Sequence, residues 1–179
     1  MNHKKIVFVV AHEGYQHEEY GIPKKLLEEV GFQVMTASNK PGTAIGKDES
    51  TTTVDMVIKD INIDDCGGIF FIGGPGAMEH LDNQVSYDII KKVNTAGKPL
   101  GAICISTRIL ANAGVLTGKE ATGWNGDGKL GDIFKEHGVK YINKEVVVDD
   151  TLITATGPSA AQEFGEKIIS LLQDQRSWG

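Results

Sequence analysis

The chain reads Pro99-Leu-Gly-Ala-Ile-Cys-Ile-Ser106 near its middle, and this stretch decides the fold. Residues 99–103 are apolar or small and predict a strand buried on both faces, as in a parallel sheet. Residues 106–113 predict a helix that Gly114 ends. A strand that runs directly into a helix is half of a βα unit, and the turn between the two falls on Cys104.

The same alternation of strands and helices runs along the rest of the chain. Apolar runs predict two further buried strands, at residues 5–11 and 68–72, and residues 32–37 predict a third strand. Apolar residues at helical spacing predict helices at residues 18–30, 85–96, 130–137 and 160–172. Alternation of this kind implies βαβ units, so we expect an α/β fold, a doubly wound and mainly parallel sheet sandwiched by helices.

Local signals refine this pattern. Residues 145–148 and 152–155 predict two strands around a tight turn. Residues 51–61 have high β-propensity and predict an edge strand or hairpin, after a loop at residues 39–50. Pro23 is expected in the first turn of its helix or at a kink. The spacing Ser159-Ala-Ala-Gln162 predicts a capping box that opens the last helix.

Size, charge and cysteine content bound the function. The chain has 179 residues, which favours one domain over residues 1–179. A net charge of -6 argues against nucleic-acid binding. No apolar run reaches the ~20 residues of a membrane span, and no secretory leader is evident, so we expect no membrane contact and a cytoplasmic location. Two cysteines without a C-x-x-C pair suggest free thiols rather than disulfides or a metal site.

The glycine-rich segments and the histidines suggest no cofactor or metal. Residues 73–76 do not match a dinucleotide-binding motif, and residues 114–119 are one residue short of a phosphate-binding loop. Histidine and carboxylate residues between His12 and Glu19 match no standard zinc spacing. We therefore expect neither a cofactor nor a metal ion.

The turn at Cys104 has the character of a nucleophile elbow. Such an elbow needs small residues two places either side of the nucleophile, and Ala102 and Ser106 meet that demand. At the start of the following helix, the helix dipole should lower the pKa of the Cys104 thiol. The alternative is an inert buried thiol, which is common for free cysteine.

Several segments together resemble the ThiJ/PfpI superfamily, which includes the Parkinson-disease-associated deglycase and the PfpI-type intracellular peptidases. The resemblance covers the chain in order. It rests on Glu18-Glu-Tyr-Gly-Ile-Pro23, Ile72-Gly-Gly-Pro-Gly76, Ala102-Ile-Cys104, Ala113-Gly-Val-Leu116 and Val146-Val-Val-Asp149, with Leu152-Ile-Thr-Ala-Thr-Gly-Pro158.

The resemblance implies a flavodoxin-like fold, commonly a homodimer, and a set of site residues. Cys104 would be the reactive cysteine and Glu19 its proton partner, with the pair most sensibly a neutral carboxyl beside a thiolate. Backbone N–H groups of Gly74 and Ile105 would surround the sulfur or an oxyanion. Pocket residues would be Trp124, Thr156, Gly157 and Pro158, with His80 as the remaining candidate for a base or else a surface residue.

One departure from the family pattern shapes the functional hypotheses. Peptidase members carry a histidine directly after the cysteine, and this chain has Ile105. The favoured hypothesis is a stress-related glyoxalase- or deglycase-like enzyme that acts on small reactive carbonyls through Cys104 and Glu19. The alternatives are a non-catalytic redox-sensing or chaperone-like stress protein that uses Cys104 oxidation, and an intracellular cysteine peptidase.

Overall fold

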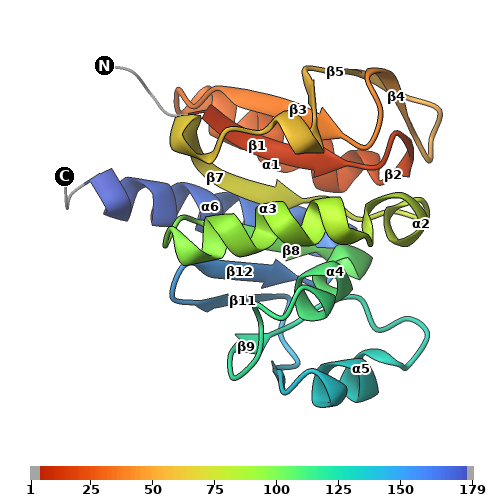
Figure 1. The fold of residues 1–179 in the computed structure, drawn as a ribbon, viewed down its shortest axis with the longest axis vertical. Coiled ribbons are helices and arrows are strands. Elements are labelled where there is room, and N and C mark those ends of the chain that lie inside the picture. The colour runs from red at the N-terminus through yellow and green to blue at the C-terminus, as the bar shows by residue number, and fades with distance from the viewer. Residues whose placement is uncertain (1–4, 177–179) are drawn as a thin grey trace.

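The central feature of the structure is a seven-stranded sheet (Figure 1). The structure is a computed structural model that describes residues 5–176, without the side chain of Arg176. The strand order is β11-β12-β8-β7-β1-β3-β6, and every pairing is parallel except that of β11 with β12. The bounds are β1 (Lys5–Val10), β3 (Val34–Ser38), β6 (Met56–Val57), β7 (Cys66–Phe71), β8 (Leu100–Ile103), β11 (Val146–Asp149) and β12 (Leu152–Ala155).

Helices cover both faces of this sheet. One face carries α1 (His17–Glu29) and α6 (Ala161–Arg176), which pack against each other. The other face carries α2 (Ala77–Leu81), α3 (Gln84–Thr95), α4 (Thr107–Asn112) and α5 (Leu130–Glu136). The predicted α/β fold with a mainly parallel, helix-covered sheet is therefore confirmed.

The two cores follow from the alternation of side chains along the strands. In β1, Phe8 points into the core beneath α1 and α6, whereas Val7 and Val9 point into the core beneath α3 and α4. All three side chains are essentially inaccessible to water. A strand buried on both faces needs an unbroken apolar run, which explains why the sequence of β1 shows no polar alternation.

Shorter elements surround the sheet. A three-stranded sheet combines β2 (Glu13–Tyr15), β4 (Gly42–Gly46) and β5 (Thr51–Val54), and a two-stranded sheet combines β9 (Glu120–Ala121) and β10 (Lys140–Tyr141). Residues 51–61 thus supply both a hairpin strand, β5, and the edge strand β6. The loop predicted at residues 39–50 is wrong in part, because β4 lies within it and pairs with β5.

Two helix details also differ from the sequence predictions. Pro23 lies in the interior of α1, so the first-turn position is wrong, and the alternative of a kink stays a prediction. Close packing accommodates it there, because the Cα of Gly165 on α6 faces the Pro23 ring without a side chain between them. The capping box at Ser159 is wrong, because a 3₁₀ turn, η4 (Pro158–Ala160), precedes α6 and the Ser159 hydroxyl donates to Glu145 instead.

The carboxyl ends of β1, β7, β8 and β12 share one end of the sheet, where β2, α2 and α4 gather in Figure 1. Parallel α/β sheets bind ligands at this end. Within residues 5–176, no helix is both long and apolar enough to cross a membrane.

Candidate active site

The turn after β8 has the strained backbone of a nucleophile elbow. Cys104 has φ 63°, a left-handed value that is uncommon for a residue with a side chain. It begins a 3₁₀ turn, η3 (Cys104–Ser106), which continues into α4. The Ser106 hydroxyl donates to the Ile72 carbonyl at 2.7 Å and fixes the turn to the neighbouring strand end. This geometry presents the thiol at the carboxyl end of the sheet.

A pair of glycines after β7 makes room for this turn. A Cβ on Gly73 would lie 2.6 Å from the Cβ of Cys104 and 2.6 Å from Oε1 of Glu19. Gly74 has φ 122°, and a Cβ there would overlap the carbonyl of Gly14. Glycine is therefore required at both positions. The absent side chain of Gly73 is what lets the thiol and the carboxyl approach each other.

Glu19 lies in the first turn of α1 and is completely buried. The side chain of Gln16 caps this helix by accepting from the N–H of Glu18 at 2.6 Å and of Glu19 at 3.2 Å. Neither carboxyl oxygen of Glu19 has a hydrogen bond of ordinary geometry within residues 5–176, although the Cys104 thiol and the Gly73 N–H are close enough to lower its pKa. Burial outweighs both and raises the pKa of Glu19 to about 8. The carboxyl is therefore protonated at neutral pH.

The expected fall in the pKa of Cys104 is wrong for the free site. Burial, and after it the charge of Glu19, raise the pKa of this thiol to about 12. The main-chain N–H groups of Ile105 and Gly74 act in the opposite direction and lower the pKa. The physical reason is desolvation: the loss of water around the sulfur outweighs the two main-chain N–H groups.

Glu19 and Cys104 consequently behave as one titrating pair. At neutral pH both groups hold their protons, and the first proton leaves the pair near pH 8. The neutral Glu19 agrees with the arrangement expected from the sequence, whereas the resting thiolate does not. A neutral carboxyl next to a thiol can donate a proton from one oxygen and accept a proton at the other.

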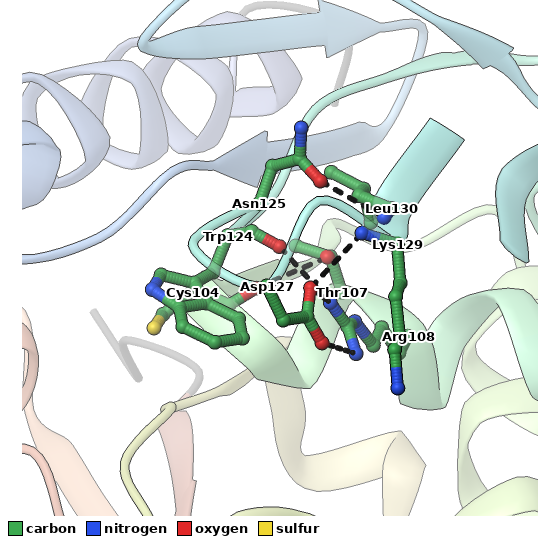
Figure 2. Close-up of polar contacts among 8 residues, drawn as sticks. All are labelled: Cys104, Thr107, Arg108, Trp124, Asn125, Asp127, Lys129 and Leu130. Carbon is green, nitrogen blue, oxygen red and sulfur yellow. Dashed lines mark hydrogen bonds and ion pairs between the residues drawn. The ribbon is translucent and has the colours of Figure 1, made fainter. Parts of the chain in front are cut away.

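Trp124 forms the next part of the site. Its main-chain N–H donates to the carbonyl of Cys104 at 3.1 Å, and the Thr107 hydroxyl donates to the same carbonyl at 3.1 Å. Figure 2 shows the indole of Trp124 and the sulfur of Cys104 projecting to the same side of the loop. The structure therefore brings this predicted pocket residue next to the cysteine.

The other predicted pocket residues lie in two places: three of them follow β12, and His80 lies on α2. Ala155 of β12 lies in register with Ile103 of β8, so Thr156 follows its strand at the level of Cys104. Gly157 is buried there and Pro158 is exposed at the start of η4. His80 lies on α2, half-buried, and its ring makes no hydrogen bond or ion pair in the part of the chain that the structure describes.

Sequence reasoning missed an ion pair beside the site. Arg108, on α4, is buried and makes a bidentate salt bridge to Asp127. The interaction lowers the pKa of Asp127 to about 2. The signal was weak: Arg108 is one turn after Cys104 and would read as an ordinary helix residue, and the pairing spans 19 residues of sequence.

No metal site accompanies these residues. Among residues 5–176, no group of three or more histidine, cysteine, aspartate or glutamate side chains is placed to hold an ion. The other cysteine, Cys66, lies at the opposite end of β7, and its thiol donates to the Asn62 carbonyl. It is buried, and this burial raises its pKa.

Comparison with known proteins assigns the chain to a family. The model of the DJ-1/PfpI family matches residues 4–171. The chain belongs to the DJ-1/PfpI family. The resemblance inferred from the sequence is thereby confirmed.

Individual relatives extend along nearly the whole chain. An uncharacterised protein of Methanocaldococcus jannaschii is 32% identical, over 97% of this chain and 84% of its own. Deglycase PfpI of Pyrococcus furiosus is 31% identical, over 94% of this chain and 99% of its own. A ThiJ/PfpI domain protein from Brachyspira murdochii has the same fold, with a TM-score of 0.91 at 24% identity, over 96% of this chain and 98% of that chain.

Proposed function

We propose that this protein is a cysteine-dependent enzyme that converts small reactive dicarbonyls into 2-hydroxy acids. The observation that carries the proposal is that Cys104 and Glu19 lie together against the bare Cα of Gly73. The pKa of Glu19 is raised to about 8, so its carboxyl holds a proton at neutral pH. Relatives named as deglycases support the same chemical class. Methylglyoxal is the simplest substrate of this class and would give lactate.

The chemistry needs a nucleophile and one group that moves protons. The sulfur of Cys104 attacks the aldehyde carbon and forms the C–S bond, while the carbonyl π electrons move to the oxygen. Glu19 donates its proton to that oxygen and takes the thiol proton at its second oxygen, so no free thiolate is needed beforehand. The N–H groups of Gly74 and Ile105 stabilise negative charge that develops beside the sulfur.

The remaining steps are an isomerisation and a hydrolysis. A proton leaves the former aldehyde carbon while the neighbouring carbonyl oxygen gains one, which gives an enediol. A proton then adds at the neighbouring carbon while the hydroxyl beside the sulfur loses its proton, which turns the hemithioacetal into a 2-hydroxy thioester without an external oxidant. Glu19 is the group next to Cys104 that can carry the proton between the two carbons. Water then adds its hydroxyl to the thioester carbon, and its proton returns to the sulfur, which releases the 2-hydroxy acid.

This reaction fits the site better than the two alternatives. Peptide cleavage needs a group that takes the thiol proton and then, as an acid, donates a proton to the leaving amine. The residue after the cysteine cannot do this, because it is Ile105, which packs against the apolar core. Redox sensing favours an exposed, low-pKa thiol, whereas burial raises the pKa of Cys104. Carbonyl addition with coupled proton transfer demands neither feature.

The test is lactate formation from methylglyoxal by three proteins. Wild type and Cys66→Ser should form lactate at similar rates, because Cys66 lies at the far end of the sheet. Cys104→Ser should form none above the uncatalysed rate. Equal rates from wild type and Cys104→Ser, or no lactate from any of the proteins, would refute the proposal.

A homodimer belongs to the same proposal, since the resemblance to the family implies one. Analytical ultracentrifugation at micromolar concentration tests it directly. A species of twice the 19.3 kDa chain mass supports the dimer, and a monomer throughout the range contradicts it.

A further inference from the structure

The proposed mechanism leaves one feature beside the site unexplained, the buried arginine on α4. Arg108 has only 7% of its surface exposed. Its two terminal nitrogens bind the two oxygens of Asp127 at 3.0 and 2.7 Å. Burying a guanidinium is costly unless it is paired in good geometry, so a buried arginine with a fork-like pair calls for a structural or functional reason.

The guanidinium of Arg108 also contacts Trp124. We call residues 122–129 the Trp124 loop. One terminal nitrogen of Arg108 donates to the Trp124 carbonyl at 3.4 Å, and the guanidinium carbon lies 5.4 Å from the centre of the indole ring. Figure 2 shows Arg108 reaching from α4 into the Trp124 loop, with Asp127 on the loop facing it. The cation therefore holds backbone and ring of one residue at once.

A glycine on the loop also lies against the indole. A Cβ on Gly126 would lie 2.5 Å from Cζ2 and 2.7 Å from Cε2 of Trp124, so the ring rests directly on the Gly126 backbone. The loop is braced further, because the Lys129 N–H donates to Asp127 and the Leu130 N–H donates to Asn125. The bond from the Trp124 N–H to the Cys104 carbonyl ties the loop to the elbow.

We propose that Arg108 is a positioning residue that holds the Trp124 indole as a flat wall beside Cys104, and that this wall selects dicarbonyls with a flat aromatic substituent over those with a methyl group. The inference rests on the proposed function for its substrate class. An aryl group can stack on a fixed indole, whereas a methyl group gains little from it. Phenylglyoxal, which would give mandelate, is the matching substrate and methylglyoxal the reference.

The main test compares KM for the two substrates in variants that loosen the wall. Gly126→Ala pushes the indole away without removing a charge, Asp127→Asn weakens the fork, and Arg108→Lys keeps the charge but loses the fork. Each variant should raise KM for phenylglyoxal about 2- to 10-fold, with KM for methylglyoxal and both kcat values nearly unchanged. Lys24→Gln, which breaks an ion pair on α1, controls for loss of a positive charge.

A second measurement does not depend on turnover. In a Cys66→Ser background, iodoacetamide and its N-phenyl derivative alkylate only Cys104, and the ratio of their rates reports the aromatic wall. In wild type the N-phenyl reagent should be favoured, and the preference should fall in all three variants. Because the Arg108 variant can fold poorly, Gly126→Ala, which leaves the ion pair intact, decides the outcome together with its melting temperature.

These readouts separate the two proposals. If neither dicarbonyl is consumed but the alkylation preference falls in Gly126→Ala and Asp127→Asn, the proposed function fails and the positioning role stands. If both dicarbonyls are consumed through Cys104 and the KM and alkylation ratios stay within 2-fold of wild type in all three variants, the positioning role fails and the proposed function stands. Lower melting temperatures without a change in either ratio also overturn the positioning role.

Discussion

Two carboxyl groups near the Cys104 turn have pKa values that are shifted in opposite directions from their ordinary values. Glu19 is completely buried, has no hydrogen bond of ordinary geometry within residues 5–176, and has its pKa raised to about 8. Asp127 accepts both arms of the Arg108 fork, and its pKa is lowered to about 2. The same chemical group therefore stays neutral on one element and charged on another.

The two carboxyl groups suit different roles beside Cys104, because their surroundings differ. Desolvation without a countercharge keeps Glu19 protonated, and a protonated carboxyl can take part in proton transfer at neutral pH. A bidentate cation keeps Asp127 ionised, and a permanent ion pair can hold a loop but cannot exchange protons. One carboxyl suits chemistry and the other suits positioning.

The largest expected effect is on turnover when Glu19 loses its ability to move protons. Glu19→Gln should lower kcat for methylglyoxal by about 10²- to 10⁴-fold, because the amide cannot accept the thiol proton. Glu18→Gln is the matched control, since Glu18 is exposed in the same helical turn and should keep near-normal activity. A Glu19→Gln variant with more than a tenth of wild-type kcat would remove Glu19 from the mechanism.

The next effect concerns stability against pH. The folded pKa of Glu19, about 8, is above its ordinary value of 4.5, so its contribution to stability is fully present below pH 4.5 and is lost as the pH rises to 8. The free energy of unfolding of wild type should therefore fall, relative to Glu19→Gln, by roughly 4 kcal/mol across this interval. Urea unfolding at pH 5 and pH 8.5 measures it, and parallel curves for the two proteins would contradict a raised pKa.

The ion pair between Arg108 and Asp127 should break at low pH, whereas the contribution of Glu19 to stability is lost at high pH. The folded pKa of Asp127, about 2, is below its ordinary value of 3.8, so the ion pair stabilises the protein above pH 4 and is lost as the pH falls to 2. In a Trp178→Phe background, where Trp124 is the remaining tryptophan, its emission should stay constant from pH 7 to 4 and change only near pH 2. Asp127→Asn should show the altered emission already at pH 7, and unaltered emission there would separate the indole from the ion pair.

The smallest expected effect concerns the loop that holds Thr156 and Ser159, where the nearby carboxylate is exposed to water. The hydroxyls of Thr156 and Ser159 both donate to the exposed carboxylate of Glu145, at 3.0 and 2.9 Å. Glu145→Gln should lower the free energy of unfolding by only about 0.5–1 kcal/mol, because water competes for these bonds. Thermal unfolding measures the loss, and we expect Cys104 alkylation to stay within 2-fold of wild type; a larger change would show that Glu145 also controls access to Cys104.

The strands and most helices could be predicted because their signals are local. The buried runs of β1, β7 and β8 cannot alternate with polar residues, and helices such as α3 show their apolar spacing directly. The three-residue strand β2 and the strand β4 could not be predicted, since their short segments gain stability from pairing with distant residues. The failure at Ser159 has the same origin, because its hydroxyl found a partner 14 residues away.

The sequence by itself determined the elbow, since small residues at 102 and 106 and the paired glycines at 73 and 74 are demands of the backbone. It also marked Cys104, Glu19 and Trp124 as neighbours through family resemblance. Only the tertiary structure decided the charge states of Cys104 and Glu19, because desolvation and pairing depend on what surrounds a group in space. For that reason the thiol predicted to be acidic is a weak acid, and a buried arginine that no motif marked forms an ion pair with Asp127 beside the site.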